Sequence, residues 1–281
     1  MNPFRGLRRR TVLSAILTAT TLTACGSLSS PPSDGELHRL RQMRFVLLGE
    51  VHDNAVQHSM RAALVADLLA DGRPTRVVFE QMGRANDTLI AGAARDAESV
   101  ATAGRLDRTG WRWPLHKPLI EAALTGGATI LGGDLSRDDS RAIVRSGKSA
   151  VPADLRTLLD GARWSPDDQA AVEREIDAGH CGALPPSQFA GMALAQRARD
   201  AALASAMLQA GKTVERVILI AGNGHVRRDL GVPRYLMAAG VAGSQIVSIG
   251  YLEQSDPAAP YDLVRVTSAA SRADPCAGFQ K

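Results

Sequence analysis

The chain has 281 residues, of which 45% are hydrophobic and 22% are charged, so it can bury the core of at least one globular domain. Its formal net charge is +4, but four of its 33 basic residues precede Cys25, where there is no acidic residue. The rest of the chain is balanced at 29 basic against 29 acidic residues, which gives no indication of the basic surface that nucleic-acid binding requires.

Residues 1–24 have the three parts of a secretory signal peptide. Arg5, Arg8, Arg9 and Arg10 precede a short uncharged stretch, residues 11–22, and Leu22-Thr23-Ala24-Cys25 is a lipobox. The stretch is shorter than the roughly 20 residues that a membrane-spanning helix needs, so a transmembrane anchor is the less favoured alternative. We predict that Cys25 is lipidated and that residues 25–36, rich in Ser and Pro, tether one domain, residues 37–281, to a membrane.

The lipobox predicts a bacterial cell-envelope protein. By analogy with the sorting of bacterial lipoproteins, Gly26 in place of Asp after the cysteine favours the outer membrane. Two further cysteines, Cys181 and Cys276, would then lie in an oxidising compartment. They predict either a disulfide bond or two free thiols, and their wide spacing leaves both open.

Six short apolar runs, rich in β-branched residues, predict buried strands. They cover residues 45–48, 77–79, 129–131, 217–220, 246–249 and 263–266. Amphipathic patterns over 54–70 and 187–209 predict helices between them, and residues 137–186, richer in charge, predict a helical insertion or lid. Strands that alternate with helices are typical of an α/β domain with a mostly parallel sheet flanked by helices.

Polar residues follow four of these strands. Two of the strands end in similar motifs, Gly49-Glu50-Val51-His52 and Gly222-Asn223-Gly224-His225, and two others lead to Glu80 and Asp134. Ligands bind at the carboxyl ends of parallel strands, so we expect these side chains to converge at one edge of the sheet. They suit general acid and base chemistry, or a divalent metal held by Glu50, His52 and His225. For each residue alone, a helix cap or a structural hydrogen bond is the alternative.

Other polar residues have two interpretations each. His180 lies in a Gly-rich turn that either reaches a ligand or only joins two helices. Gln196, Arg199 and Asp200 share one helical face, which points back at the sheet edge or meets solvent. His116 is interpreted as a residue at a helix start, and His58 lies too far along the chain from His52 for an i, i+4 metal pair.

Taken in order, five segments resemble the ChaN family of haem-binding lipoproteins associated with iron uptake. The segments are Phe45–Asp53, Val78–Met82, His180–Pro185, Gln196–Ala201 and Ile220–Pro233. The resemblance runs from about residue 45 to residue 249. It implies a Rossmann-like α/β fold and haem binding at the outer membrane. It also implies a homodimer that brings haems face to face, and an outer-membrane haem receptor as a partner.

The resemblance also implies candidate site residues. Family haem ligation is expected to use tyrosine helped by histidine, which makes Tyr235 and His180 candidate ligands, with Arg199 and Arg227 as further cofactor-binding residues. The family belongs to a superfamily with Tiki proteases and erythromycin esterases. This implies an alternative function, an ester or peptide hydrolase, metal-dependent or acid/base, whose catalytic residues are Glu50, His52, Glu80 and His225.

Overall fold

The computed structural model describes residues 31–274, 276 and 277. The signal peptide and the lipidation site Cys25 lie outside these residues. In the part that is described, no helix has both the length and the apolar character needed to span a bilayer.

All six predicted strands are confirmed, and they form one parallel sheet in the order β3-β2-β4-β1-β5-β6. The strands are β1 (Phe45–Leu48), β2 (Thr75–Gly83), β3 (Thr129–Asp134), β4 (Arg216–Ile220), β5 (Ile246–Leu252) and β6 (Leu263–Val266). The central strands β1 and β4 are buried along their whole length, which explains their continuous apolar sequences. The α/β fold class predicted from the sequence is therefore confirmed.

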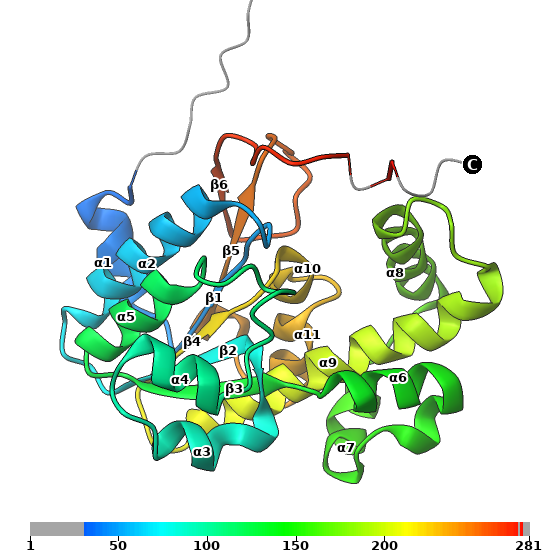
Figure 1. Ribbon diagram of the computed structural model, residues 1–281, viewed down its shortest axis with the longest axis horizontal. Helices are drawn as coiled ribbons and strands as arrows, with labels where there is room; N and C mark the ends of the chain where they lie inside the picture. The colour runs from blue at the N-terminus through cyan, green and yellow to red at the C-terminus, as the bar shows by residue number, and fades with distance from the viewer. Residues whose placement is uncertain (1–30, 275, 278–281) are drawn as a thin grey trace, which may run out of the picture.

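Helices cover both faces of the sheet (Figure 1). One apolar core joins the sheet to α1 (Asp34–Gln42), α2 (Ala55–Leu69), α4 (Ala97–Ala103) and α5 (Lys117–Thr125). A second core joins the other face to α6 (Arg137–Ser146), α7 (Ala153–Gly161), α9 (Phe189–Ala210) and α11 (Val232–Ala238). Shorter elements are η1 (Arg84–Asn86), α3 (Asp87–Ala91), η2 (Gly147–Ala150), η3 (Pro186–Gln188), α10 (Asn223–Val226) and η4 (Gly243–Gln245).

The predicted insertion at 137–186 is helical, and its last long helix is α8 (Pro166–Gly179). The Ser165 hydroxyl accepts a hydrogen bond from the Asp168 amide, and the Asp168 carboxylate accepts one from the Ser165 amide, a capping box that fixes where α8 begins. A disulfide joins Cys181, just after α8, to Cys276, whose segment crosses from β6 towards α8 (Figure 1). The bond ties the end of the chain to the insertion.

Candidate ligand site at the carboxyl edge of the sheet

The alternation of side chains along the strands divides the polar residues between the two faces of the sheet. Val46 and Leu48 of β1 face the core that contains α2 and α5, so Glu50 continues on that face. In β2, Val78 faces the core that contains α9, and Glu80 follows it on the α9 side. Residues that are neighbours at the edge therefore belong to two buried clusters, one around Glu50 and one around Glu80.

The first cluster surrounds the buried carboxylate of Glu50. Its Oε1 accepts hydrogen bonds from His52 Nδ1 at 2.8 Å, His116 Nε2 at 3.2 Å and Gln81 Nε2 at 3.3 Å. Its Oε2 is paired with the Arg61 guanidinium. Arg61 is fully buried, so this ion pair is held apart from water and its two charges depend on each other.

His58 also belongs to this cluster, in which both of its ring nitrogens form hydrogen bonds. Its Nε2 donates to the carbonyl oxygen of His52 at 3.0 Å, which leaves Nδ1 to accept a hydrogen bond from Arg61 NH2 at 3.0 Å. Glu50, His58 and His116 do have ligand atoms within 4.8 Å of one another, a spacing that suits a metal ion. However, Arg61 supplies a positive charge at Glu50 and donates to His58 Nδ1, so it competes with a cation for these ligand atoms. Nδ1 of His116 and Oε1 of Gln81 are buried without a hydrogen-bond partner.

Burial keeps the histidines of this cluster neutral. It lowers the pKa of His116 to about 2 and lowers the pKa of His58. The protein atoms that displace water from His52 likewise lower its pKa, although half of the side chain is exposed. Because His52 Nδ1 donates to Glu50, its Nε2 carries a lone pair that is available to a ligand.

The second cluster surrounds Glu80. Its Oε1 lies 2.7 Å from Arg199 NH2 and 3.2 Å from His225 Nε2, and its Oε2 accepts a hydrogen bond from the Gly222 amide at 2.7 Å. On its other side, His225 Nδ1 donates to Asp200 Oδ1 at 2.7 Å. Arg199 also binds Asp134 at 2.5 Å, so the polar face of α9 points at the sheet edge, as one of the two interpretations predicted.

The charged groups of the second cluster shift one another's pKa values. Burial alone would lower the pKa of His225, but Glu80 and Asp200 outweigh it and raise that pKa to about 10. Burial alone would raise the pKa of Glu80, but His225 and Arg199 hold it well below its usual range. Burial raises the pKa of Asp200 to about 6. At neutral pH, His225 is therefore a cation between two carboxylates.

This raised pKa predicts a pH dependence of stability. The protonated form of His225 contributes stability in full below about pH 6.5, and that stability is lost as the pH rises towards 10. We expect the free energy of unfolding of the wild type to fall between pH 6.5 and pH 9.5, and His225→Gln to show a smaller fall, in urea titrations at the two pH values. Equal falls in the two proteins would show that His225 is not held protonated.

The two Gly-x-x-His motifs interlock at this edge. A Cβ atom on Gly222 would lie 2.6 Å from Cε1 and 3.0 Å from Nε2 of His52, and one on Gly49 would lie 2.2 Å from Oδ1 of Asn223. Each glycine thus makes room for a side chain from the other motif. Since β1 and β4 are adjacent, with Leu48 opposite Ile220, both motifs leave the sheet at the same level.

Gly222→Ala is therefore expected to displace the His52 ring and to lower the free energy of unfolding by about 1–3 kcal/mol, the usual effect of overpacking. Gly224→Ala is a matched control two residues away, because a Cβ atom there would meet nothing within 4 Å. Urea unfolding of the two variants measures the difference. Equal stability of both variants would contradict the interlocked arrangement.

A cavity of about 850 Å³ opens beside these clusters, which lies within the range of about 300–1,000 Å³ common for ligand pockets. His52, Glu80, Gln81, Asp134 and Arg199 contribute to its wall at the sheet edge. The segment that follows α4, with Trp111, and the start of α6 form other parts of the wall. Trp111 packs edge-on against His52, with 4.7 Å between ring centroids, so His52 is held both by Glu50 and by the indole.

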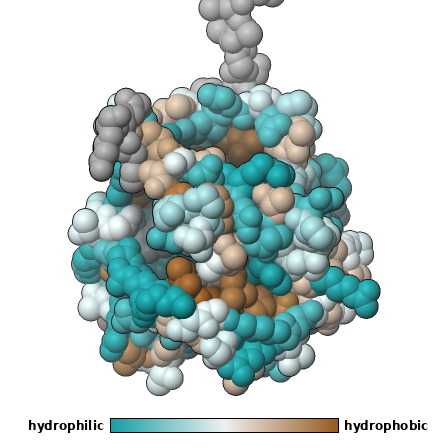
Figure 2. All heavy atoms as spheres, turned by 90° about the vertical axis from the view of Figure 1, so that its right-hand side faces the viewer, coloured by the Kyte–Doolittle hydropathy of each residue, from teal (hydrophilic) through white to brown (hydrophobic). Residues whose placement is uncertain are grey.

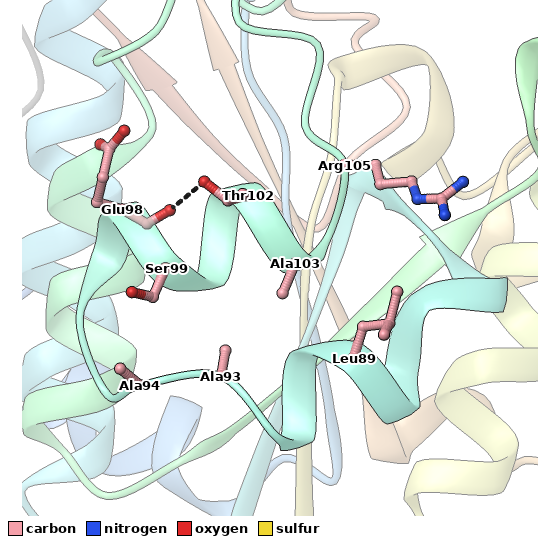
Figure 3. A pocket seen from close by; sticks show the side chains of 8 residues that line it. All are labelled: Leu89, Ala93, Ala94, Glu98, Ser99, Thr102, Ala103 and Arg105. Atoms are coloured by element: carbon pink, nitrogen blue, oxygen red, sulfur yellow. Dashed lines mark hydrogen bonds between the residues drawn. The ribbon is translucent and has the colours of Figure 1, made fainter.

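Other hollows lie on the surface. Figure 2 shows the side of the molecule at the right of Figure 1, where hydrophilic residues dominate and apolar residues appear as patches between them. A hollow of about 460 Å³ between α3 and α4 is lined mainly by small side chains (Figure 3). It contains none of the histidines or buried carboxylates described above, which makes the cavity at the sheet edge the candidate ligand site.

Three of the predicted cofactor-binding residues lie away from this cavity. Tyr235 is fully buried in the core beside α9 and does not line the cavity, so haem ligation by this residue stays a prediction of the family resemblance. His180 does not line the cavity either, and its Nδ1 donates to the carbonyl of Ile176 at the end of α8, so its contact with a ligand also stays a prediction. Arg227 is paired with Glu175 and Asp229 and likewise does not line it.

The predicted metal set is not brought together. Among the described residues, the group with metal-ligand spacing is Glu50, His58 and His116, not Glu50, His52 and His225. His225 belongs to the Glu80 cluster, where both of its ring nitrogens face carboxylates. The four residues proposed as catalytic are therefore divided, Glu50 with His52 and Glu80 with His225.

Sequence reasoning missed His58, Arg61 and His116 as members of the site. The signal was present in α2, where His58 and Arg61 are polar residues on the same face as the buried Leu64, Val65 and Leu68. Polar residues on an apolar face need buried partners. His116 precedes α5, as expected, but it is fully buried against Glu50.

The structure is that of an α/β protein with a cavity, the candidate ligand site, at the carboxyl edge of a parallel sheet. The family described as "Haem-binding uptake, Tiki superfamily, ChaN" matches residues 37–236, and the chain belongs to this family. No functionally curated protein matches the sequence.

A comparison with solved structures found one that shares the fold and others of lower similarity. The structure described as cofacial heme binding to ChaN of Campylobacter jejuni is 18% identical in sequence, covers 82% of this chain and 89% of its own, and superposes with a TM-score of 0.68. A variant of the erythromycin esterase EreC in its open conformation is 14% identical, with 83% and 78% of the two chains covered and a TM-score of 0.38. The type III effector HopBA1 is 12% identical, with 81% and 88% covered and a TM-score of 0.45.

Proposed function

We propose that this protein binds haem in the cavity at the carboxyl edge of the sheet, with Nε2 of His52 as the ligand of the iron. Membership of a haem-binding uptake family supports the choice of haem. The observation that carries the choice of site is His52, half exposed at the cavity, with Nδ1 bound to Glu50 and Nε2 free of protein partners in the described part of the chain. A carboxylate that orients the imidazole in this way is the usual support of a metal-bound histidine.

The residues at the cavity fit haem through an imidazole rather than a phenolate. Tyr235 and Tyr251 are buried, and the hydroxyl of Tyr261 donates to the carbonyl of Asn223. None of these three tyrosines, which are all that the sequence contains, lines the cavity. Bound iron would supply a Lewis-acidic centre for the His52 nitrogen, and Glu50 would increase the basicity of the ring.

A haemin titration of the full chain, purified in detergent, tests this function. We expect the Soret band to shift and sharpen and to saturate with added protein. A spectrum that does not differ from haemin in the same detergent would contradict the proposal.

The state of the second cluster favours binding over hydrolysis. His225 holds both ring nitrogens against carboxylates, and Glu80 is held by Arg199, His225 and the Gly222 amide. A general base needs a lone pair that reaches its substrate, and these two groups already have theirs engaged. The arrangement stiffens the wall of the cavity instead.

We further propose that the protein is anchored at the bacterial outer membrane through lipidated Cys25. The lipobox at residues 22–25 and the Gly that follows it support this localisation, and the Cys181–Cys276 disulfide suits an oxidising compartment. Labelled palmitate should be incorporated by the wild type in cells and lost in Cys25→Ser. Equal labelling of both would contradict lipidation at this residue.

We also propose that two copies of the protein form a homodimer when haem is bound. The similar structure, ChaN of Campylobacter jejuni, is described as showing cofacial haem binding. A haem bound at the mouth of the cavity would leave one face of its ring exposed to the haem of a second copy of this protein. Light scattering with and without haemin should show a doubling of mass with haemin. An outer-membrane haem receptor as a partner stays a prediction of the family resemblance.

A further inference from the structure

The cavity lining contains more arginines than acidic residues, which are Glu80, Asp107, Asp134 and Asp139. Five arginines contribute to its lining: Arg84, Arg105, Arg137, Arg141 and Arg199. Three of them are matched by acids, since Arg84 pairs with Asp154, Arg137 with Asp107 at 2.6 Å, and Arg199 with Asp134 and Glu80. The other two arginines of the lining are Arg105 and Arg141.

These two guanidinium groups are available to a ligand. Arg105 is exposed, and its side chain has no hydrogen bond or ion pair with the rest of the described chain. Among the described residues, Arg141 forms one ion pair, with Asp138 at 3.8 Å, and the two side chains are 67% and 95% exposed. An exposed pair at that distance attracts weakly, so it leaves Arg141 free to bind another anion.

Arg105 and Arg141 lie on two segments of the cavity wall that are joined by an ion pair. The ion pair between Asp107 and Arg137 joins the segment after α4 to the first turn of α6. Arg105 precedes Asp107 by two residues, and Arg141 follows Arg137 by one helical turn. The two free cations therefore lie on the two segments that this ion pair joins.

The backbone at Arg105 is also unusual. Its φ angle is 53°, in the left-handed region that favours glycine, so a residue with a Cβ atom is strained here. Figure 3 shows Arg105 at one end of the small-residue hollow, with its side chain directed away from Ala93, Ala94 and Ser99. The fold thus keeps an unpaired arginine where glycine would be easier to accommodate.

We infer that Arg105 and Arg141 bind the carboxylate groups of the ligand, so that the cavity selects a flat macrocycle carrying two carboxylates over its uncharged analogues. A guanidinium presents paired N–H donors that match the two oxygens of a carboxylate. This inference rests on the proposed function, because haem carries two propionates, and it adds which residues recognise them.

The test compares haemin with haemin dimethyl ester, whose carboxylates are blocked, by Soret titration of the full chain in one detergent. Arg105→Gly and Arg141→Ala are each expected to weaken haemin binding roughly tenfold and to leave ester binding unchanged. Arg145→Ala is the matched control, one turn further along α6 and outside the cavity lining. Arg105→Gly also relieves the backbone, so it should unfold no more easily than the wild type.

The outcomes separate this inference from the proposed function. If the wild type binds haemin but both variants bind it as Arg145→Ala does, or if the wild type binds the ester as tightly as haemin, the role of these arginines is overturned and haem binding stands. If the wild type binds neither compound, the proposed function itself fails.

Discussion

His52→Ala is expected to lower the affinity of the protein for ferric haem by about 100-fold. The substitution removes the imidazole that lines the cavity and is oriented by Glu50, and loss of even a supporting residue at a metal ligand costs about 10–100-fold in affinity. Because half of the His52 side chain is exposed, the fold should tolerate alanine there. Haemin titrations of variant and wild type, each followed at the Soret band, measure the change.

His38→Ala serves as the control for this prediction, since His38 is an exposed residue of α1 outside the cavity lining. It should bind haemin as the wild type does. Unchanged affinity in His52→Ala would move the iron ligand to another residue and remove the main support for the proposed site.

Arg61→Met is expected to lower the free energy of unfolding by about 3–5 kcal/mol, the largest stability effect that we predict. The substitution leaves the carboxylate of Glu50 buried without its counter-charge, and one half of a buried ion pair is strongly destabilising on its own. Urea unfolding measures the loss. Lys148→Ala, which removes an exposed pair with Asp160, should cost only about 0–1 kcal/mol.

A second substitution distinguishes lost charge balance from lost packing. Glu50→Gln in the Arg61→Met background removes the unpaired charge, so the double variant should be more stable than Arg61→Met alone. A double variant that is less stable than Arg61→Met would show that the carboxylate is not the source of the destabilisation.

The sheet could be predicted because its strands are short continuous apolar runs, which is what burial on both faces requires. The exception is the end of β2, which continues past Phe79 to Gly83 through the polar residues Glu80 and Gln81. They lie beyond the end of β4, where the register with β3 shifts between Phe79 and Gly83, and their side chains enter the two clusters. These polar residues end the apolar run in the sequence, but they remain in the strand because both have polar partners there.

The candidate site could be predicted only in part. Residues that follow strands, such as His52 and Glu80, were found because topology alone brings strand ends to one edge. Arg61 and His116 were missed because their partner, Glu50, is distant along the chain, and no spacing within one helix reveals such a contact. Tyr235 was favoured by its closeness in sequence to His225, but α11 turns it into the core.

A crystal structure of the full chain with haemin tests the central claim most directly. The account predicts iron bonded to Nε2 of His52, Nδ1 of the same ring still donating to Glu50, and the macrocycle within the cavity at the carboxyl edge of the sheet. Iron bonded to a different side chain, or haem seated outside this cavity, would contradict it.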